Sequence, residues 1–247
     1  LSEKERRLFQ RLAVFVGGWV LEAVEAVCPG EDLDLEEVFD TLSQLVNKSM
    51  VQVERQPGHE TRYRMLEAIR QYASEKLSES GESESLRRQH CAWFEQFVKI
   101  SNSKIRTKEM VVWLKKLDAE VDNLRAVLEW ALEDGIDPLA GIRIANKLRD
   151  YWTFRNQVAE GYRWLEKSLE ATHKVSPFPL ALQVKTLNSL ILLFDWWAKP
   201  ALATERLNQV LELCDILGEE AIWDRAEALV WQGFLEVVNY GNLSLGL

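Results

Sequence analysis

The sequence is poor in the residues from which metal centres and disulfide frameworks are built. It contains only three cysteines and three histidines, namely Cys28, Cys91, Cys214, His59, His90 and His173. No two of them have the spacing of metal ligands, and neither C-x-x-C nor H-E-x-x-H occurs. An odd number of widely separated cysteines makes no disulfide framework either. We therefore expect no metal site and a reducing, cytoplasmic environment.

The motifs of nucleotide hydrolysis and of nucleophilic catalysis are also missing. No G-x-x-x-x-G-K-[ST] phosphate loop occurs, and the one adjacent glycine pair, Gly17-Gly18, has no lysine after it. His90 and Cys91 are neighbours, but adjacent residues on a helix point about 100° apart and do not face each other. We therefore predict that this chain is not an enzyme and binds no cofactor itself.

Excess positive charge and long apolar runs are absent as well. The formal net charge is −9, so the chain does not have the charge balance of a polyanion-binding module. No apolar run reaches the roughly 18 residues of a membrane span, and no signal peptide is visible. The chain starts at Leu1 and ends within a helical pattern, so we expect it to be part of a longer protein without a membrane partner.

Residues 1–80 have the order of elements of a winged-helix domain. Helical patterns cover residues 3–16, 19–27 and 35–48, and MVQVER and TRYRM form a hairpin around the turn residues 56–60. A further helix starts at Glu67. The third helix has a predicted buried stripe made of Leu35, Val38, Phe39, Leu42, Leu45 and Val46.

Beyond a polar segment at 78–85, which we interpret as a hinge, the pattern is helical throughout. We predict a linking helical segment over 81–135 and helix pairs over 136–247. The predicted helices cover residues 86–101, 107–133, 138–154, 158–172, 180–197, 200–217 and 220–240. The segment 107–133 is either one long helix or a broken pair, and candidates for its core are Val112, Trp113, Leu117, Leu124, Val127, Leu128 and Ala131. Leu187 aligns with Leu229 and Leu165 with Leu207, both at a shift of 42 residues. A repeat near 40 residues is typical of an α-solenoid, and the last pair lacks its second helix, which predicts an exposed apolar face there.

Aromatic residues supply the candidates for partner binding. Most of the ten tryptophans fall at helical spacing and are best explained as core. Trp196 and Trp197 are adjacent and cannot both face one core, so one of them should be partly exposed. Tyr151, Trp152 and Arg155 lie together near a helix end. We predict that these five residues line a groove for a partner peptide.

The third helix would be the recognition helix if the winged helix bound DNA. Its start carries Glu36, Glu37 and Asp40, which would repel phosphates, and its only lysine is Lys48 at the end. Because DNA binding depends on phosphate neutralisation, DNA is an improbable partner. An intramolecular contact with another module is the stronger interpretation.

The motifs of the chain resemble a known family. LFQRLAVFVGGW, LSQLVNKSMV, YRMLEAIRQYASEKL and WLKKLDAEVDNLRAVLEWAL are similar to the region that follows the ATPase core in bacterial STAND-class signal-transduction ATPases of the LuxR and AfsR kinds. The resemblance implies an NB-ARC-like nucleotide-binding module upstream, which holds ATP or ADP, then a winged helix and a tetratricopeptide-like solenoid.

One site of that family does not carry over. Its Met-His-Asp motif matches Met65, Leu66 and Glu67 here, and leucine cannot donate a hydrogen bond to a phosphate. Arg62, Arg64 or Arg70 could contact the phosphate instead, because arginine binds it bidentately. The alternative is that these arginines pair with local carboxylates such as Glu67.

The sequence therefore predicts a mainly α-helical, non-catalytic chain: a winged-helix domain over 1–80 followed by an α-solenoid of helix pairs. As the resemblance implies, the winged helix restrains the nucleotide-binding module in cis, and the solenoid senses an unidentified protein or small-molecule effector. A DNA-binding winged-helix transcription factor with a helical interaction domain is the first alternative. A hydrolase or transferase and a passive scaffold are the others.

Overall fold

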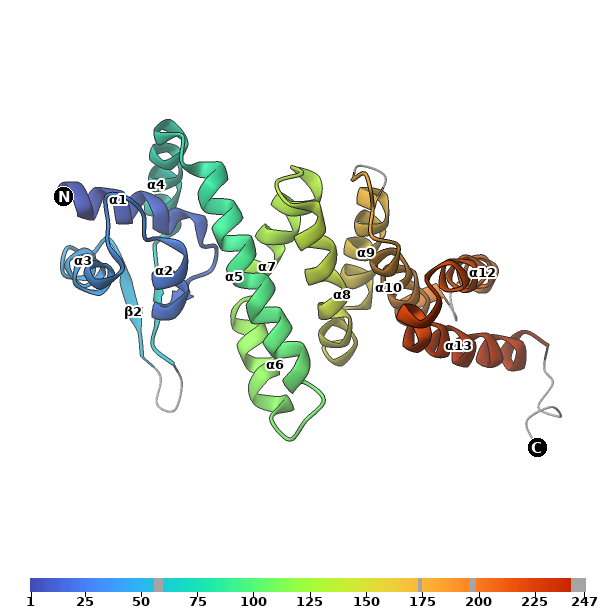
Figure 1. Cartoon of the computed structure of the whole chain (residues 1–247). Helices are drawn as coiled ribbons and strands as arrows, with labels where there is room; N and C mark the ends of the chain where they lie inside the picture. Colours follow the sequence, from blue (N-terminus) through green and yellow to red (C-terminus); the bar gives the residue numbers. More distant parts are fainter. Residues whose placement is uncertain (56–59, 173–174, 196–198, 241–247) are drawn as a thin grey trace. The chain divides into compact units, whose positions relative to one another are not determined.

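The computed structural model describes residues 1–55, 60–172, 175–195 and 199–240. The chain forms two compact units, Leu1–Asp137 and Pro138–Leu247, whose helices are labelled along the chain in Figure 1. Each unit is described by itself below. The finer division at residue 80 that the sequence indicates stays a prediction.

Unit 1 begins with the helices of a winged helix, whose bounds follow from the local sequence. Helix α1 (Glu3–Arg11) starts at a capping box in which Ser2 and Glu5 bond reciprocally. A single 3₁₀ turn, η1 (Leu12–Val14), extends it. Asp34 and Glu37 form the same kind of box at the start of α3 (Leu35–Asn47). Helices α2 (Leu21–Val27) and α4 (Glu67–Ser80) complete this group.

The sheet of unit 1 has one more strand than the sequence predicted. Strands β2 (Gln52–Glu54) and β3 (Arg62–Arg64) form the expected hairpin, and β1 (Trp19–Val20) pairs antiparallel with β3, giving the order β1-β3-β2. The expectation of a helix starting at Trp19 was therefore wrong. Gly17 and Gly18 have positive φ angles of 81° and 103°, and this turn lays Trp19 beside the middle of β3 before the helix starts at Leu21.

The buried stripe of α3 is narrower than predicted. Val38, Leu42 and Leu45 are buried, as expected, where α3 packs on α1 and α2. Leu35 and Phe39, predicted to be buried, are 55% and 51% exposed. Leu35 and Phe39 lie one turn apart on another side of α3, and neither α1 nor α2 covers that side. This exposed side belongs to the candidate site described below.

Three further helices complete unit 1. They are α5 (Ser83–Lys104), α6 (Met110–Ala119) and α7 (Val121–Leu128), which ends in a π-helical turn, η2 (Glu129–Glu133). The predicted helix over 107–133 is therefore the broken pair, interrupted at Glu120. Leu117, Leu124 and Val127 are in the core as predicted, but Val112 is exposed, because α6 packs on its neighbours with the side that carries Leu114 and Leu117.

Unit 2 is built of helix pairs with a regular spacing. Helices α8 (Pro138–Phe154), α10 (Leu180–Leu190) and α13 (Ile222–Tyr240) start at intervals of 42 residues, and so do α9 (Val158–Thr172) and α12 (Pro200–Leu217). The π turn η3 (Ile191–Asp195) extends α10, and the 3₁₀ turn η4 (Gly218–Ala221) precedes α13. Each helix packs on its predecessor, and α10 also contacts α8 and α13, as in an α-solenoid. The repeat is longer than the roughly 34 residues of the tetratricopeptide unit.

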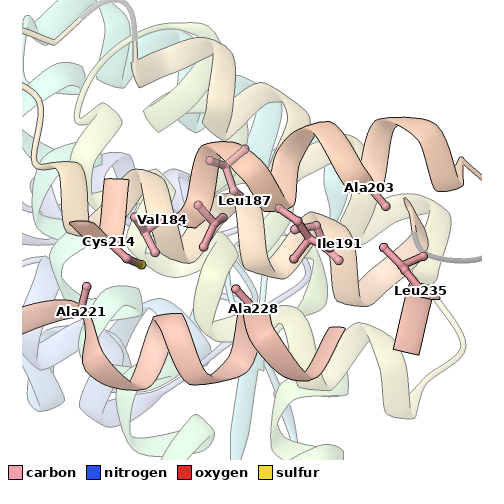
Figure 2. Packing of buried hydrophobic residues seen from close by; sticks show 10 residues of the cluster. Val184, Leu187, Ile191, Ala203, Cys214, Ala221, Ala228 and Leu235 are labelled. Atoms are coloured by element: carbon pink, nitrogen blue, oxygen red, sulfur yellow. The ribbon is translucent and has the colours of Figure 1, made fainter. Parts of the chain in front are cut away.

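The apolar core of this unit lies where three helices meet. It combines Val184, Leu187 and Ile191 of α10 and η3 with residues of α12 and α13 (Figure 2). The contributing residues of the latter two helices are Ala203, Leu207, Val210, Cys214, Ala228 and Leu235. None of the helices in the described ranges is long and apolar enough to cross a bilayer.

Candidate functional site

The exposed side of α3 is the surface that a winged helix would offer to a partner. It carries Leu35 and Phe39 together with Glu36 and Asp40, all of them exposed. Lys48, at the end of the helix, donates to both carboxylate oxygens of Glu5 at 2.6 and 2.7 Å. Close cationic partners lower the pKa of two acids beside this surface: Lys48 does so for Glu5, and Lys4 for Glu37. The face is therefore apolar and acidic, and the lysines nearest to it are already bonded to carboxylates.

The three arginines named as phosphate candidates bond to groups of the protein itself. Arg62 forms an ion pair with Glu120 and donates to the backbone carbonyl of Ala119 at 2.9 Å. Arg64 lies 2.8 Å from a carboxylate oxygen of Glu54. A phosphate contact at Arg62 or Arg64 would have to replace these bonds.

The third arginine shows the local pairing that the sequence left open as an alternative. Arg70 donates to both carboxylate oxygens of Glu67, at 2.8 and 3.0 Å, and this contact lowers the pKa of Glu67. Leu66, which takes the place of the family's histidine, is about half exposed just before α4.

A buried asparagine, which the sequence analysis did not single out, joins the winged helix to the helices behind it. The side-chain oxygen of Asn123 accepts from the backbone N–H of Val16 at 2.7 Å, and its amide donates to the carbonyl of Gly18 at 2.8 Å. The same amide donates to Glu120 at 2.7 Å. Burial raises the pKa of Glu120, against the opposing effect of Arg62. This cluster of Asn123, Glu120 and Arg62 with the Gly17-Gly18 turn is called the joint below.

The joint depends on glycine at two positions. A Cβ atom on Gly18 would lie 2.7 Å from the backbone carbonyl oxygen of Tyr63, and one on Gly17 would lie 3.0 Å from a carboxylate oxygen of Asp122. Only a residue without a side chain allows this close approach together with a positive φ angle. One signal in the sequence could have revealed Asn123. It is an uncharged polar residue that lies four positions before Val127, on the apolar side of the same helix.

The polar segment at 78–85 is fastened to α1. The guanidinium of Arg11 donates to both carboxylate oxygens of Glu82, at 2.9 and 3.0 Å, and to the carbonyl of Cys28 at 3.0 Å. This bond lowers the pKa of Glu82. Arg11 is buried, so the segment interpreted as a hinge is tied to the first helix of the winged helix in this structure.

His90 and Cys91 have the surroundings of core residues. The ring of His90 lies among Phe15, Phe94 and Trp130, with centroid distances of 5.0, 4.6 and 5.4 Å. Burial lowers the pKa of His90 to about 3 and raises that of Cys91 to about 12. A neutral imidazole and a protonated thiol with no access to solvent provide no nucleophile at neutral pH.

The groove candidates of unit 2 fall into two groups. Tyr151 and Trp152 are buried, and Trp152 packs so closely on α9 that a Cβ on Gly161 would lie 2.5 Å from its ring. These two rings are therefore buried side chains rather than groove lining, and α9 covers that of Trp152. Arg155 is partly exposed. Trp196 and Trp197 lie outside the described residues.

Within the ranges that the structure describes, no group of three His, Cys, Asp or Glu side chains could hold a metal ion. Unit 1 contains the elements of a winged helix, with an acidic, partly apolar third helix. Unit 2 adds a stack of helix pairs. The chain thus has the fold of the class of mainly helical proteins that carry an N-terminal winged helix.

Comparison with known proteins supports that class. Residues 1–78 match the family described as a winged helix-turn-helix domain. Over 232 residues, 92% of the chain, it is 35% identical to proteins of Mycobacterium bovis and Mycobacterium tuberculosis that bear the name "Putative HTH-type transcriptional regulator". The chain spans only 26% of the length of these relatives. An uncharacterized protein of Mycobacterium tuberculosis is 45% identical over 87 residues, which cover 35% of the chain and 22% of that protein. No solved structure matches the chain.

Proposed function

We propose that the chain is the regulatory, non-catalytic part of a transcriptional regulator, in which the winged helix acts by protein contact through α3 and the helix pairs receive an effector. The names of the relatives and the winged-helix match support the regulatory role. Because the chain covers about a quarter of those relatives, the activity of the whole protein is part of the proposal.

One observation favours protein contact: two of the basic side chains of the wing are already bonded to carboxylates of the protein. Arg62 and Arg64 of the wing bond to Glu120 and Glu54, while the exposed side of α3 carries Glu36 and Asp40 without a basic residue among them. Binding to duplex DNA gains most of its free energy from Lys and Arg at phosphates. An acidic face with two exposed apolar side chains is better matched by a basic, partly apolar protein surface.

The resemblance to STAND-class ATPases names the partner in cis as a nucleotide-binding module that holds ATP or ADP. In this proposal the winged helix restrains that module, and an effector on unit 2 shifts the balance between the restrained and released states. Such a shift requires that the effector bind the two states with different affinity. The rigid joint behind β3 would carry a displacement of the helices α5–α7 to the winged helix, because both belong to one packed unit.

A second candidate is direct DNA binding by the winged helix, and it is favoured by a specific observation. The relatives are named as HTH-type regulators, and the family description is a winged helix-turn-helix domain. In that case Gln44 and Asn47, both exposed in the second half of α3, would supply amides for base edges in the major groove.

Cross-linking from α3 separates the two candidates. A photo-reactive amino acid at position 39, in cells that produce the protein, should cross-link to protein and not to DNA. In vitro, we expect no binding to a duplex of about 30 base pairs tighter than the non-specific range of about 10⁻⁴ to 10⁻⁶ M at physiological salt. Nanomolar, salt-dependent binding that is lost in Asn47→Ala but kept in Phe39→Ser would support the DNA-binding candidate and reject ours.

A further inference from the structure

The last helix of unit 2, α13, has two apolar sides, and only one of them is covered. Ala228 and Leu235 point into the core shared with α10 and α12, and both are buried (Figure 2). On the other side, Trp223 is 85% exposed and Val230 is 70% exposed. A helix that is apolar on opposite sides is typical of a helix packed between two neighbours.

The 42-residue repeat shows what the open side of α13 corresponds to. Shifting α10 by 42 residues places Val184 on Ala226, Leu187 on Leu229 and Ile191 on Gly233. The three residues of α10 and η3 are fully buried in the cluster that also contains Ala203, Leu207 and Val210 of α12. Their three counterparts on α13 are exposed. Ala226, Leu229 and Gly233 therefore occupy, one repeat later, the positions on which α12 packs in α10 and η3.

A second correspondence concerns the side of α13 next to these three residues. The amide of Asn188 on α10 donates to the backbone carbonyl of Asp224 at the start of α13, at 2.9 Å. Position 188 of α10 thus faces α13, the equivalent helix of the next repeat. Its counterpart on α13, 42 residues on, is Val230, an exposed apolar side chain.

The side chains of the open face of α13 are also smaller than their counterparts on α10 and η3. Ala226 and Gly233 replace Val184 and Ile191, so that seven side-chain carbons of α10 and η3 have only one counterpart on α13. A Cβ on Gly233 would meet no atom within 4 Å. Close packing leaves few voids in protein cores, so a helix on this face must carry larger side chains than α12 has at the facing positions. Figure 2 shows Cys214 at the Val184 end of the α12 face and Ala203 at the Ile191 end.

From these correspondences we infer that the face formed by Ala226, Leu229 and Gly233 binds one amphipathic α-helix, packed on α13 as α12 packs on α10. The occupant carries apolar residues at the spacing of Ala203, Leu207, Val210 and Cys214, with large side chains at the first and last of these positions. This inference does not rest on the proposed function, because it concerns unit 2 and the repeat register alone.

Two labelled peptides provide the probe. One has the sequence of α12, residues 200–217, and the other carries the changes Ala203→Leu and Cys214→Leu. Fluorescence anisotropy with the whole chain should show binding of both. The enlarged peptide should bind at least ten-fold more tightly, because ten-fold corresponds to about two additional buried methylenes at about 0.8 kcal/mol each, and the two changes add more than that. Equal affinity, or tighter binding of the unmodified peptide, contradicts the inferred complementarity.

Variants of the chain locate the site. Gly233→Glu introduces a charge in the open face where a Cβ has room, and Leu229→Asp is the second variant in case the first disturbs folding, which circular dichroism reports. Each should weaken binding of the enlarged peptide about ten-fold or more. Ile216→Asp is the control, because Ile216 is 71% exposed on α12 outside this face, and it should bind like the parent. Unchanged binding in both α13 variants, or a concentration-dependent dimer in sedimentation that Gly233→Glu abolishes, would overturn the inference, the latter because a second copy would then be the occupant.

Discussion

Replacing Asn123 with alanine removes the centre of the joint while leaving the apolar core of unit 1 in place. The backbone N–H of Val16 loses its acceptor at 2.7 Å, and the carbonyl of Gly18 loses its donor at 2.8 Å. Each buried backbone group left without a partner costs about 1–3 kcal/mol. We expect Asn123→Ala to lower the free energy of unfolding of unit 1 by about 2–6 kcal/mol.

Urea denaturation followed by circular dichroism measures the loss, and hydrogen exchange at the Val16 amide assigns it to the joint. That amide should exchange slowly in the parent and much faster in the variant. Asn47→Ala is the matched control, because Asn47 is exposed on α3 and its removal should change stability by less than about 0.5 kcal/mol. A loss below about 1 kcal/mol with the Val16 amide still protected would falsify the role given to Asn123.

Three other perturbations test the same unit. Gly18→Ala should destabilise it more than Gly135→Ala, because both have positive φ but only Gly18 has a backbone carbonyl 2.7 Å from the added Cβ; thermal melts compare the two, and equal shifts would contradict the reasoning. Arg62→Ala leaves the buried Glu120 carboxylate without its cation and should cost about 3–5 kcal/mol at neutral pH. Since burial already raises the pKa of Glu120, the cost of Arg62→Ala should shrink in acid, where the carboxylate takes up a proton. A cost that does not change with pH would contradict the role given to this ion pair. His90 has a folded-state pKa of about 3, below its ordinary 6.5, so the unfolded chain binds the proton first as the pH falls. The contribution of the buried neutral imidazole to the free energy of unfolding is therefore fully present above pH 6.5 and is lost as the pH falls towards 3. Between pH 6.5 and 5 the loss should be about 2 kcal/mol, and His90→Leu should remove this part of the urea-measured pH dependence.

Several elements could be predicted because their signals are local. The bounds of α8, α9 and α12 agree with the prediction to the residue, since the apolar periodicity of each helix is local and Pro138, Pro200 and Gly218 mark three of the six ends. The capping residues Ser2 and Asp34 were likewise predictable from the first turn of each helix. The exposed apolar side of α13 followed from the repeat count, and the exposure of Trp223 and Val230 confirms it.

The errors have a different physical origin. Leu35 and Phe39 have the spacing of a buried stripe, but burial depends on which neighbouring helices reach that side, and none does. Trp19 was assigned to a helix because the two-residue strand β1 exists only through its pairing with β3. Trp152 was named as a groove candidate because the helix that covers it, α9, comes later in the chain, and the pattern of α8 alone does not show that contact.

The sequence by itself determined the order of the helices and of the β2–β3 hairpin, the repeat length and the lack of catalytic motifs, because capping, turns and apolar periodicity act over a few residues. Only the tertiary structure decided how the charges of the winged helix are used and what holds it to the helices behind it. Asn123 bonds to Val16 across 107 positions of the chain, and Arg62 pairs with Glu120 across 58. Such contacts arise from single polar side chains that the fold brings together, and a single polar residue produces no periodicity from which its partner could be read.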